Sequence, residues 1–276
     1  MKSICKKVDL FLSRFSNSRR WRLGAILVVG LLLPVQSNAF GGFHMPKLEP
    51  KPAPKGSVVL LHGLLRSSAQ MNKIERALAQ DNWQVINIDY PTRVGPIEHL
   101  IDIVMDKCHE QGVDADTITH FVGYSLGALI VRGLITHYPE DFDVGRIVLL
   151  APPNGGSEVA DFHKNNPLYK WITGPVGEQL TTSENTVLNL MLGDSLNGYE
   201  AGVIAGSQTL DPLHAPLLPA PHDGKVSVSS THLEGIQDHI VLEANHTFFP
   251  QTKAVIEQTQ HFLNHGHFTK ISQNRH

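Results

Sequence analysis

The segment Phe121-Val-Gly-Tyr-Ser-Leu-Gly127 sets a serine between two glycines, after an apolar run and before a stretch rich in Ala, Leu, Ile and Val. A serine nucleophile on a tight strand-to-helix turn needs small neighbours, because the turn strains the backbone and brings it close to adjacent strands. Gly123 and Gly127 supply that room. The turn also directs the backbone amide of Leu126 toward a developing oxyanion. The segment predicts that Ser125 is a nucleophile and that Leu126 helps to stabilise the charge it creates.

A second segment, Val58-Val-Leu-Leu-His-Gly-Leu64, is an apolar run that ends in His-Gly. The loop beyond such a strand can deliver the other oxyanion donor. Leu64 is the first candidate for this backbone amide, and Leu65 is the alternative. We expect His62 to fix the loop through hydrogen bonds rather than to act as a base.

Apolar runs alternate with helical patterns through most of the chain. The runs are rich in β-branched residues and lack strict alternation, which indicates strands buried on both faces of a parallel sheet. The expected strands are residues 58–61, 84–89, 117–122, 146–150, 202–207 and 238–243, and the expected helices are 67–80, 96–111, 125–137 and 251–262. This order predicts an α/β fold with a mostly parallel, doubly wound sheet and helices on both faces.

The first residues are typical of a targeting segment. Basic residues lead into the apolar run of residues 23–35, and Ser37-Asn-Ala39 supplies small residues for cleavage before Phe40. We therefore expect residues 1–39 to be a signal peptide of an exported protein, periplasmic or secreted. The alternative is an uncleaved membrane anchor formed by residues 23–35.

Charge excludes one class of partner. Residues 1–39 hold seven Lys or Arg and one acid, so their removal changes the formal net charge from -3 to -9. Such an acidic protein is not expected to bind nucleic acid, which requires clustered Lys and Arg.

The mature chain divides into three stretches. Residues 40–56 are rich in Pro and Gly and form a linker, residues 57–264 form the domain, and residues 265–276 form a polar, frayed tail. Within the domain, residues 152–198 are longer than a usual connection and hold several aromatic side chains. This insertion is either a lid over a pocket or a pair of packing helices at the domain edge.

The chain resembles the α/β-hydrolase superfamily, in particular its lipase and esterase branch. The resemblance rests on Leu61-His-Gly-Leu-Leu, on Gly123-Tyr-Ser-Leu-Gly127 and on Ala151-Pro-Pro-Asn-Gly-Gly-Ser157, and it extends over residues 57–264. It implies the α/β-hydrolase fold and a nucleophile, an acid and a histidine in that chain order, the last two on loops after late strands.

The implied histidine is His246, which follows the last strand and precedes the last helix. The implied acid is Asp223 in an Asp-Gly turn, where it would orient the imidazole. Rival histidines are His214, His222 and His239, and rival acids are Asp211, Asp161 and Asp194.

We therefore expect a serine hydrolase that cleaves carboxylic esters, of a small molecule or a lipid, through a Ser-His-Asp triad and an acyl-enzyme. Residues 261, 265 and 267 are histidines, but we expect them to be solvated, and no cofactor or metal is implied. An acyltransferase or a thioesterase would use the same triad. A non-catalytic binding protein that retains the fold is a further alternative.

Overall fold

The computed structural model describes residues 53–270, apart from the side chains of residues 184–187. Its centre is a sheet of six parallel strands in the order β2-β1-β3-β4-β5-β6. The strands are β1 (Ser57–Leu61), β2 (Gln84–Ile88), β3 (Ile118–Tyr124), β4 (Asp143–Leu150), β5 (Ala201–Gly206) and β6 (Asp238–Leu242). Every residue of β1 and β5 is buried, as expected for strands covered on both faces. The predicted α/β fold, with a parallel sheet and helices on both faces, is confirmed.

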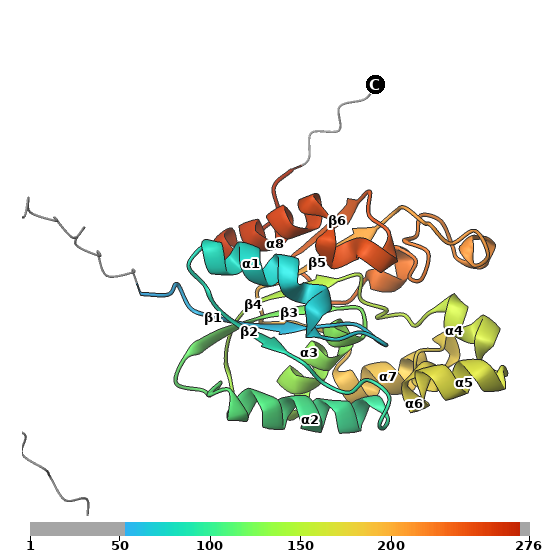
Figure 1. Ribbon diagram of the computed structural model, residues 1–276, viewed down its shortest axis with the longest axis horizontal. Coiled ribbons are helices and arrows are strands. Elements are labelled where there is room, and N and C mark those ends of the chain that lie inside the picture. Colours follow the sequence, from blue (N-terminus) through green and yellow to red (C-terminus); the bar gives the residue numbers. More distant parts are fainter. Residues whose placement is uncertain (1–52, 271–276) are drawn as a thin grey trace, which may run out of the picture. The chain divides into compact units, whose positions relative to one another are not determined.

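Helices cover the sheet on both sides (Figure 1). One face packs against α1 (Asn72–Gln80) and α8 (Lys253–His265), and the other against α2 (Ile97–Glu110), α3 (Leu126–His137) and α7 (Asn185–Leu192). Each face has its own apolar cluster, because a parallel sheet must bury both surfaces. Short 3-10 helices complete the part of the chain that the structure describes: Ser68–Met71, Thr182–Glu184, Ala215–Leu217, Ser229–Thr231 and His246–Gln251.

The carboxyl ends of the strands meet at one edge of the sheet, because all six are parallel. The loops that follow β1, β3, β4, β5 and β6 therefore converge there, and this edge is where ligands bind in open α/β sheets. Residues from widely separated parts of the chain are thus brought to one place.

The insertion divides into two parts with different roles. Its helices α4 (Glu158–His163), α5 (Pro167–Thr173) and α6 (Pro175–Gln179) lie together at one end of the molecule (Figure 1). By contrast, α7 packs on α3 with Leu188 and Leu192 almost fully buried. Of the two expectations for residues 152–198, α7 therefore fits that of a packing helix, and a lid formed by the earlier helices stays a prediction.

Arg132 is a fully buried cation within the apolar helix α3. Its guanidinium donates to Asn154 Oδ1 and Asn189 Oδ1, both at 2.9 Å, and to the carbonyl of Gly193. Burial lowers the pKa of Arg132 to about 10, although the charge of Asp194 acts in the opposite direction. This residue ties the helix after Ser125 to the insertion, a role that the sequence patterns did not predict.

The end of the domain differs from the prediction of a frayed polar tail beginning at residue 265. Phe268 is only 4% exposed and packs against Phe262 with ring centroids 4.8 Å apart. Its amide donates to Asp238 Oδ2 at 2.8 Å, and Thr269 is hydrogen-bonded to Gln258. One buried aromatic ring is therefore enough to hold the segment up to Lys270 on the domain, and that part of the prediction was wrong.

The predicted signal peptide of residues 1–39, the apolar run 23–35 and most of the linker 40–56 lie outside the described residues, as do residues 271–276. Within residues 53–270, no helix combines the length and the hydropathy required to cross a bilayer.

Candidate active site

Ser125 lies on a strained turn between β3 and α3. Its backbone has φ 54° and ψ -116°, a conformation that residues other than glycine rarely adopt. A Cβ atom on Gly123 would lie 2.5 Å from the carbonyl oxygen of Gly127, and one on Gly127 would lie 2.4 Å from that of Leu61. Both glycines are therefore required by close backbone contacts, and the turn leaves the Ser125 side chain facing the cavity described below.

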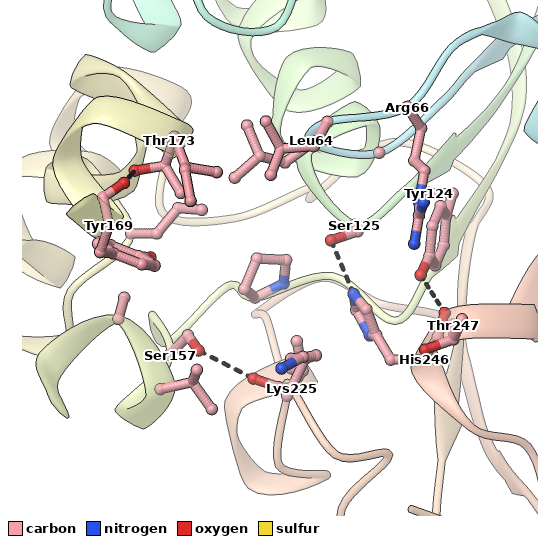
Figure 2. Close-up of a pocket in the computed structure, with 18 of the residues that line it drawn as sticks. Leu64, Arg66, Tyr124, Ser125, Ser157, Tyr169, Thr173, Lys225, His246 and Thr247 are labelled. Carbon is pink, nitrogen blue, oxygen red and sulfur yellow. Dashed lines mark hydrogen bonds between the residues drawn. The ribbon is translucent and has the colours of Figure 1, made fainter. Parts of the chain in front are cut away.

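Three side chains meet in a hydrogen-bonded row at the carboxyl edge of the sheet. His246 Nε2 lies 3.1 Å from Ser125 Oγ (Figure 2). On the other side of the ring, His246 Nδ1 lies 2.6 Å from Asp223 Oδ2. The serine follows β3, the carboxylate lies between β5 and β6, and the imidazole follows β6. The structure thus brings together the three residues selected from the sequence. Asp223 follows Ser125 by 98 positions in the chain, and His246 follows it by 121.

The carboxylate of Asp223 is fixed from both sides. Oδ1 accepts from the backbone amides of Lys225 at 2.9 Å and Val226 at 2.8 Å, while Oδ2 faces His246. The side chain is almost fully buried, and the amide of His246 donates to the Asp223 carbonyl at 2.9 Å. The Asp-Gly turn therefore aims its carboxylate inward and holds the histidine loop at the same time.

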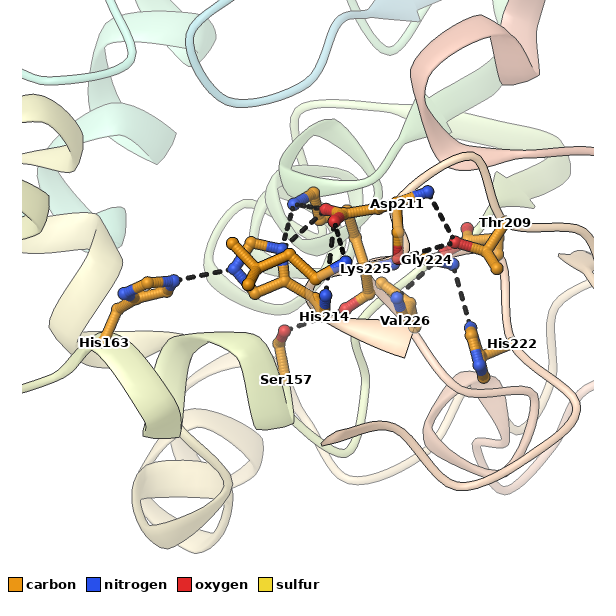
Figure 3. Close-up of polar contacts among 11 residues, drawn as sticks. Ser157, His163, Thr209, Asp211, His214, His222, Gly224, Lys225 and Val226 are labelled. Atoms are coloured by element: carbon orange, nitrogen blue, oxygen red, sulfur yellow. Dashed lines mark hydrogen bonds and ion pairs between the residues drawn. The ribbon is translucent and has the colours of Figure 1, made fainter. Parts of the chain in front are cut away.

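The rival residues occupy other positions. Asp211 accepts from His214 Nδ1 at 2.6 Å and from Lys225 Nζ at 2.7 Å, and His214 faces His163 at 2.8 Å (Figure 3). Burial opposes the charge on Asp211, but these hydrogen bonds outweigh it and leave its pKa well below the ordinary value.

The remaining rivals also lie away from Ser125. His222 accepts from the amide of Gly224, and His239 contacts the Thr231 hydroxyl. Asp161 accepts from Thr182, and Asp194 lies in the field of Arg132.

Tyr124 supports the histidine loop. Its hydroxyl donates to the backbone carbonyl of His246, and its ring lies 5.2 Å from the imidazole (Figure 2). Burial raises the pKa of Tyr124 well above the ordinary value, so the hydroxyl stays protonated and remains a donor. No sequence pattern singled out this residue, although it directly precedes Ser125.

Two backbone amides are available beside Ser125. Leu126 is the first residue of α3, so its amide has no acceptor within the helix. In the loop after β1, the amides of Gly63 and Leu65 donate to Gln70 Oε1 and Thr92 Oγ1, whereas no hydrogen bond within residues 53–270 involves that of Leu64. Leu64 and Leu126 are thus the two free donors, and the alternative at Leu65 is occupied.

His62 holds this loop in shape. Its Nδ1 donates to the Gly63 carbonyl at 3.0 Å, its Nε2 accepts from the amide of Tyr90 at 3.3 Å, and its ring stacks on that of Tyr90. Burial lowers the pKa of His62, which favours the neutral form that this pattern needs. The expectation of a loop-fixing role agrees with these contacts.

A cavity of about 360 Å³ opens beside Ser125 and extends beneath the insertion. Its walls there are mostly apolar and include Val159, Ala160, Ile172 and Leu180, with Tyr169 and Thr173 from α5 (Figure 2). No group of three or more His, Cys, Asp or Glu side chains within the described part of the chain is arranged to hold a metal ion. The arrangement suits an apolar chain attached to a carbonyl group that Ser125 can reach.

The sequence matches a model of the palmitoyl protein thioesterase family over residues 57–192. This stretch runs from β1 to α7, so it contains Ser125 but neither Asp223 nor His246. No curated protein is significantly similar in sequence to the chain.

Solved structures share the fold at low sequence identity. A lipase of Bacillus licheniformis, BlEst2 in its mature form, has 17% identity and a TM-score of 0.61, covering 79% of this chain and 95% of its own. A monoacylglycerol lipase of Paleococcus ferrophilus has 14% identity and a TM-score of 0.52, covering 77% and 94%. Tomato methylketone synthase I has 13% identity and a TM-score of 0.51, covering 76% and 98%. Since these proteins carry different activities, the likeness establishes the fold.

Proposed function

We propose that the chain is a member of the α/β-hydrolase superfamily and a serine hydrolase that cleaves carboxylic esters through an acyl-enzyme on Ser125. The observation that carries the proposal is the row Ser125 Oγ, His246 Nε2, His246 Nδ1 and Asp223 Oδ2, with separations of 3.1 and 2.6 Å. A nucleophile within hydrogen-bond reach of a base, itself oriented by a third group, is the geometry that such chemistry requires.

In the first half-reaction, Ser125 Oγ forms a bond to the substrate carbonyl carbon while its proton passes to His246 Nε2. The carbonyl oxygen becomes an oxyanion that accepts from the amides of Leu64 and Leu126. When the tetrahedral species collapses, the bond to the leaving oxygen breaks and that oxygen takes the proton from His246. The alcohol leaves, and the acyl group remains on Ser125.

In the second half-reaction, His246 removes a proton from water, and the resulting hydroxide adds to the acyl carbon. The bond to Ser125 Oγ then breaks, the serine recovers its proton from His246, and a carboxylic acid is released. Asp223 accepts from Nδ1 throughout, which keeps the imidazole in the required tautomer and stabilises its cationic form.

The substrate class follows from the walls of the cavity. Apolar residues from α4 and α5, together with Leu180, would bury the acyl chain, at about 0.8 kcal/mol for each methylene group removed from water. Phe162, Leu168 and Trp171 on the same helices are exposed, which suits contact with a lipid interface. We therefore propose a lipid or other apolar acyl ester as the substrate.

A thioesterase is the second candidate, because the palmitoyl protein thioesterase model covers the elements around Ser125. The same row of side chains would serve, since a thiolate leaves more readily than an alkoxide. Matched acyl esters and thioesters of one chain length separate the two by their kcat/KM values.

The proposal is tested with a fluorophosphonate probe and p-nitrophenyl esters of increasing chain length. We expect the probe to label the protein, and Ser125→Ala to abolish both labelling and turnover. Asp223→Asn should lower kcat by about 10³–10⁴-fold, because the amide cannot support the same tautomer.

Ser183→Ala serves as a matched control, because this serine is hydrogen-bonded to Thr181 and does not line the cavity. It should keep full activity and full labelling. A folded wild-type protein that neither reacts with the probe nor turns over any ester would favour the alternative of a non-catalytic binding protein.

We also propose that the protein is exported after removal of residues 1–39. Amino-terminal sequencing of the protein recovered outside the cytoplasm should then begin at Phe40. A membrane-bound form that begins at Met1 would instead support the anchor formed by residues 23–35.

A further inference from the structure

Arg66 is an exposed cation at the mouth of the site, on the loop that also carries Leu64. The backbone on both sides of it is fixed: the Leu65 amide donates to Thr92 Oγ1 at 3.1 Å, and the Ser68 amide donates to Asp89 Oδ1 at 2.7 Å. No acid within residues 53–270 forms an ion pair with its guanidinium. The charge therefore lies at the cavity of Ser125, with no acidic partner among the described residues.

A second cavity of about 570 Å³ lies next to the first, and Arg66 lines both. The second cavity also has polar walls from Ser67, Thr247 and Gln251, and neither cavity is lined by Asp or Glu. The side chains of Ser67, Thr247 and Gln251 make no hydrogen bond with the described part of the protein, so their donors are free. Lys225, the other cation at the first cavity, is already paired with Asp211.

Gln70 provides a buried donor between the two cavities. It is 9% exposed, it lines both cavities, and its Oε1 accepts from the amide of Gly63 at 3.2 Å. This bond fixes which end of the side-chain amide is oxygen, so Nε2 is a donor. The one hydrogen bond of this side chain within residues 53–270 is made by Oε1, so Nε2 is free to donate.

The second cavity lies beside the histidine loop, because Thr247 lines it. His246 Nε2 gives its proton to the leaving atom, and Thr247 follows His246 directly. In Figure 2, Arg66 and Thr247 lie on one side of the Ser125–His246 pair, and the insertion residues Tyr169 and Thr173 lie on the other. An acyl chain beneath the insertion therefore leaves the alcohol or thiol portion beside Arg66.

We propose that Arg66 and Gln70 form a subsite for a phosphate group on the leaving portion of the substrate. A guanidinium presents paired donors that match phosphate oxygens, and the Gln70 amide and the Thr247 hydroxyl add neutral donors. The inference rests on the proposed function, which it narrows to acyl esters or thioesters of phosphate-bearing alcohols or thiols. Two sources share this chemistry: a lysophospholipid with a glycerophosphate headgroup and an acyl thioester of phosphopantetheine.

The test compares two aryl esters of one acyl chain, the ester of 4-hydroxyphenyl phosphate and the neutral ester of 4-hydroxybenzamide. Arg66→Gln should lower kcat/KM for the phosphate ester by about tenfold and leave the neutral ester within about twofold. Arg66→Lys should keep part of the preference. High salt should weaken the wild-type preference, because an exposed charge is screened.

Arg76→Gln is the matched control. Arg76 is exposed on α1 and lines neither cavity. Its replacement by Gln removes the same positive charge as Arg66→Gln. It should leave both esters unchanged. If Arg66→Gln and the wild type have the same ratio of kcat/KM for the phosphate ester to kcat/KM for the neutral ester, the inference is overturned. The proposed hydrolase remains intact in that case.

Binding of phenyl phosphate to Ser125→Ala protein, followed by calorimetry, gives a readout that needs no turnover. When Arg66→Gln is added to the Ser125→Ala protein, phenyl phosphate should bind about tenfold more weakly. That result supports the subsite even if no ester is cleaved, and unchanged binding contradicts it. Loss of hydrolysis with retained, Arg66-dependent binding would therefore reject the proposed function alone. Comparing the lysophospholipid with the phosphopantetheine thioester then identifies the source of the phosphate.

Discussion

Asp223 divides its two carboxylate oxygens between two tasks. Oδ1 is held by the amides of Lys225 and Val226, and Oδ2 holds the imidazole of His246. Asp211 lies on the same side of the molecule and also pairs with a histidine, but it shares one oxygen between His214 and Lys225. The difference between the two acids lies in what else binds the carboxylate, which the residue type cannot reveal.

At this scale we predict that Tyr124→Phe weakens the hold on the histidine loop. The change removes the hydroxyl that donates to the His246 carbonyl and leaves a buried acceptor unpaired, at a cost of about 1–3 kcal/mol. We expect kcat to fall by about tenfold with little change in KM, because the cavity walls remain in place. Steady-state kinetics on one p-nitrophenyl ester measures both constants.

Since Tyr124 acts through His246, the pH dependence of kcat provides a second readout. A shifted profile in Tyr124→Phe indicates a displaced imidazole, whereas equal loss at every pH with a raised KM would contradict a positioning role. Phe121→Leu is a suitable control, because Phe121 is buried in the same strand and packs against Phe142 rather than the histidine.

Sequence patterns revealed the residues that stand at the ends of strands. Ser125 is marked by its two glycines, and Asp223 and His246 follow from chain order once the resemblance is known. Tyr124, Gln70 and Arg132 could not be selected in this way, because each acts through hydrogen bonds to distant backbone or side-chain groups. Such contacts leave no local pattern, although an arginine inside the apolar run of α3 is a signal that could have been pursued.

Among the elements, the link between α4 and the acid loop has an uncommon chemistry. His163 Nε2 and His214 Nε2 lie 2.8 Å apart, so a single proton must lie between them (Figure 3). Burial lowers the pKa of His163, and the nearby charges of His214 and Lys225 lower it further, while Asp211 acts in the opposite direction. A second proton would set two cations against each other and break the link.

We predict that acid loosens α4. The lowered pKa of His163 keeps its ring neutral at pH 7, so the link is intact there. It is lost at lower pH, when both Nε2 atoms carry a proton. Amide hydrogen exchange across α4 and α5, corrected for the intrinsic pH dependence of exchange, should rise on acidification. His163→Gln should keep a neutral partner for His214 and show a flatter response.

The corresponding control is His109→Gln, because His109 is exposed on α2 and pairs with Asp141 away from the insertion. It should follow the wild-type profile. Exchange in α4 that is independent of pH in the wild type would show that the pair of histidines does not hold the helix.

The elements themselves were predicted closely. Buried apolar runs located each strand to within a few residues, and the glycine-flanked serine located the start of α3. The two roles within the insertion could not be separated beforehand, because apolar residues at helical spacing look alike whether they pack on α3 or line a cavity. The prediction of a frayed tail was wrong for Phe268, because composition alone does not reveal that this ring packs against Phe262.

For the whole molecule, two histidines with lowered pKa values contribute to the response to acid. Burial lowers the pKa of His120 to about 4, with a further effect from Arg146, and burial and His232 lower that of His239 to about 4. The unfolded chain has histidines near pKa 6.5, so between about pH 6.5 and 4 the unfolded state binds more protons. The free energy of unfolding must then fall as the pH is lowered.

We predict a loss of up to about 1.4 kcal/mol per pH unit for each of these two histidines across that range, and no further loss from them below pH 4. Urea unfolding followed by tryptophan fluorescence measures it, because Trp83 packs edge-on against His120 at 4.8 Å. The double variant His120→Gln, His239→Gln should show a shallower slope. An identical slope in that variant would assign the acid sensitivity to other groups.

The tight contact between Gly127 and the Leu61 carbonyl, where a Cβ atom would come within 2.4 Å of the oxygen, restricts how this protein can diversify. The turn that presents the nucleophile and the loop that offers the Leu64 amide are pressed together, so neither can be adjusted without moving the other. Changes in substrate preference must then come from outside this turn and this loop, through α4, α5 and the Arg66 side chain. A mutational library aimed at new substrates should vary those positions and leave the two touching backbones alone.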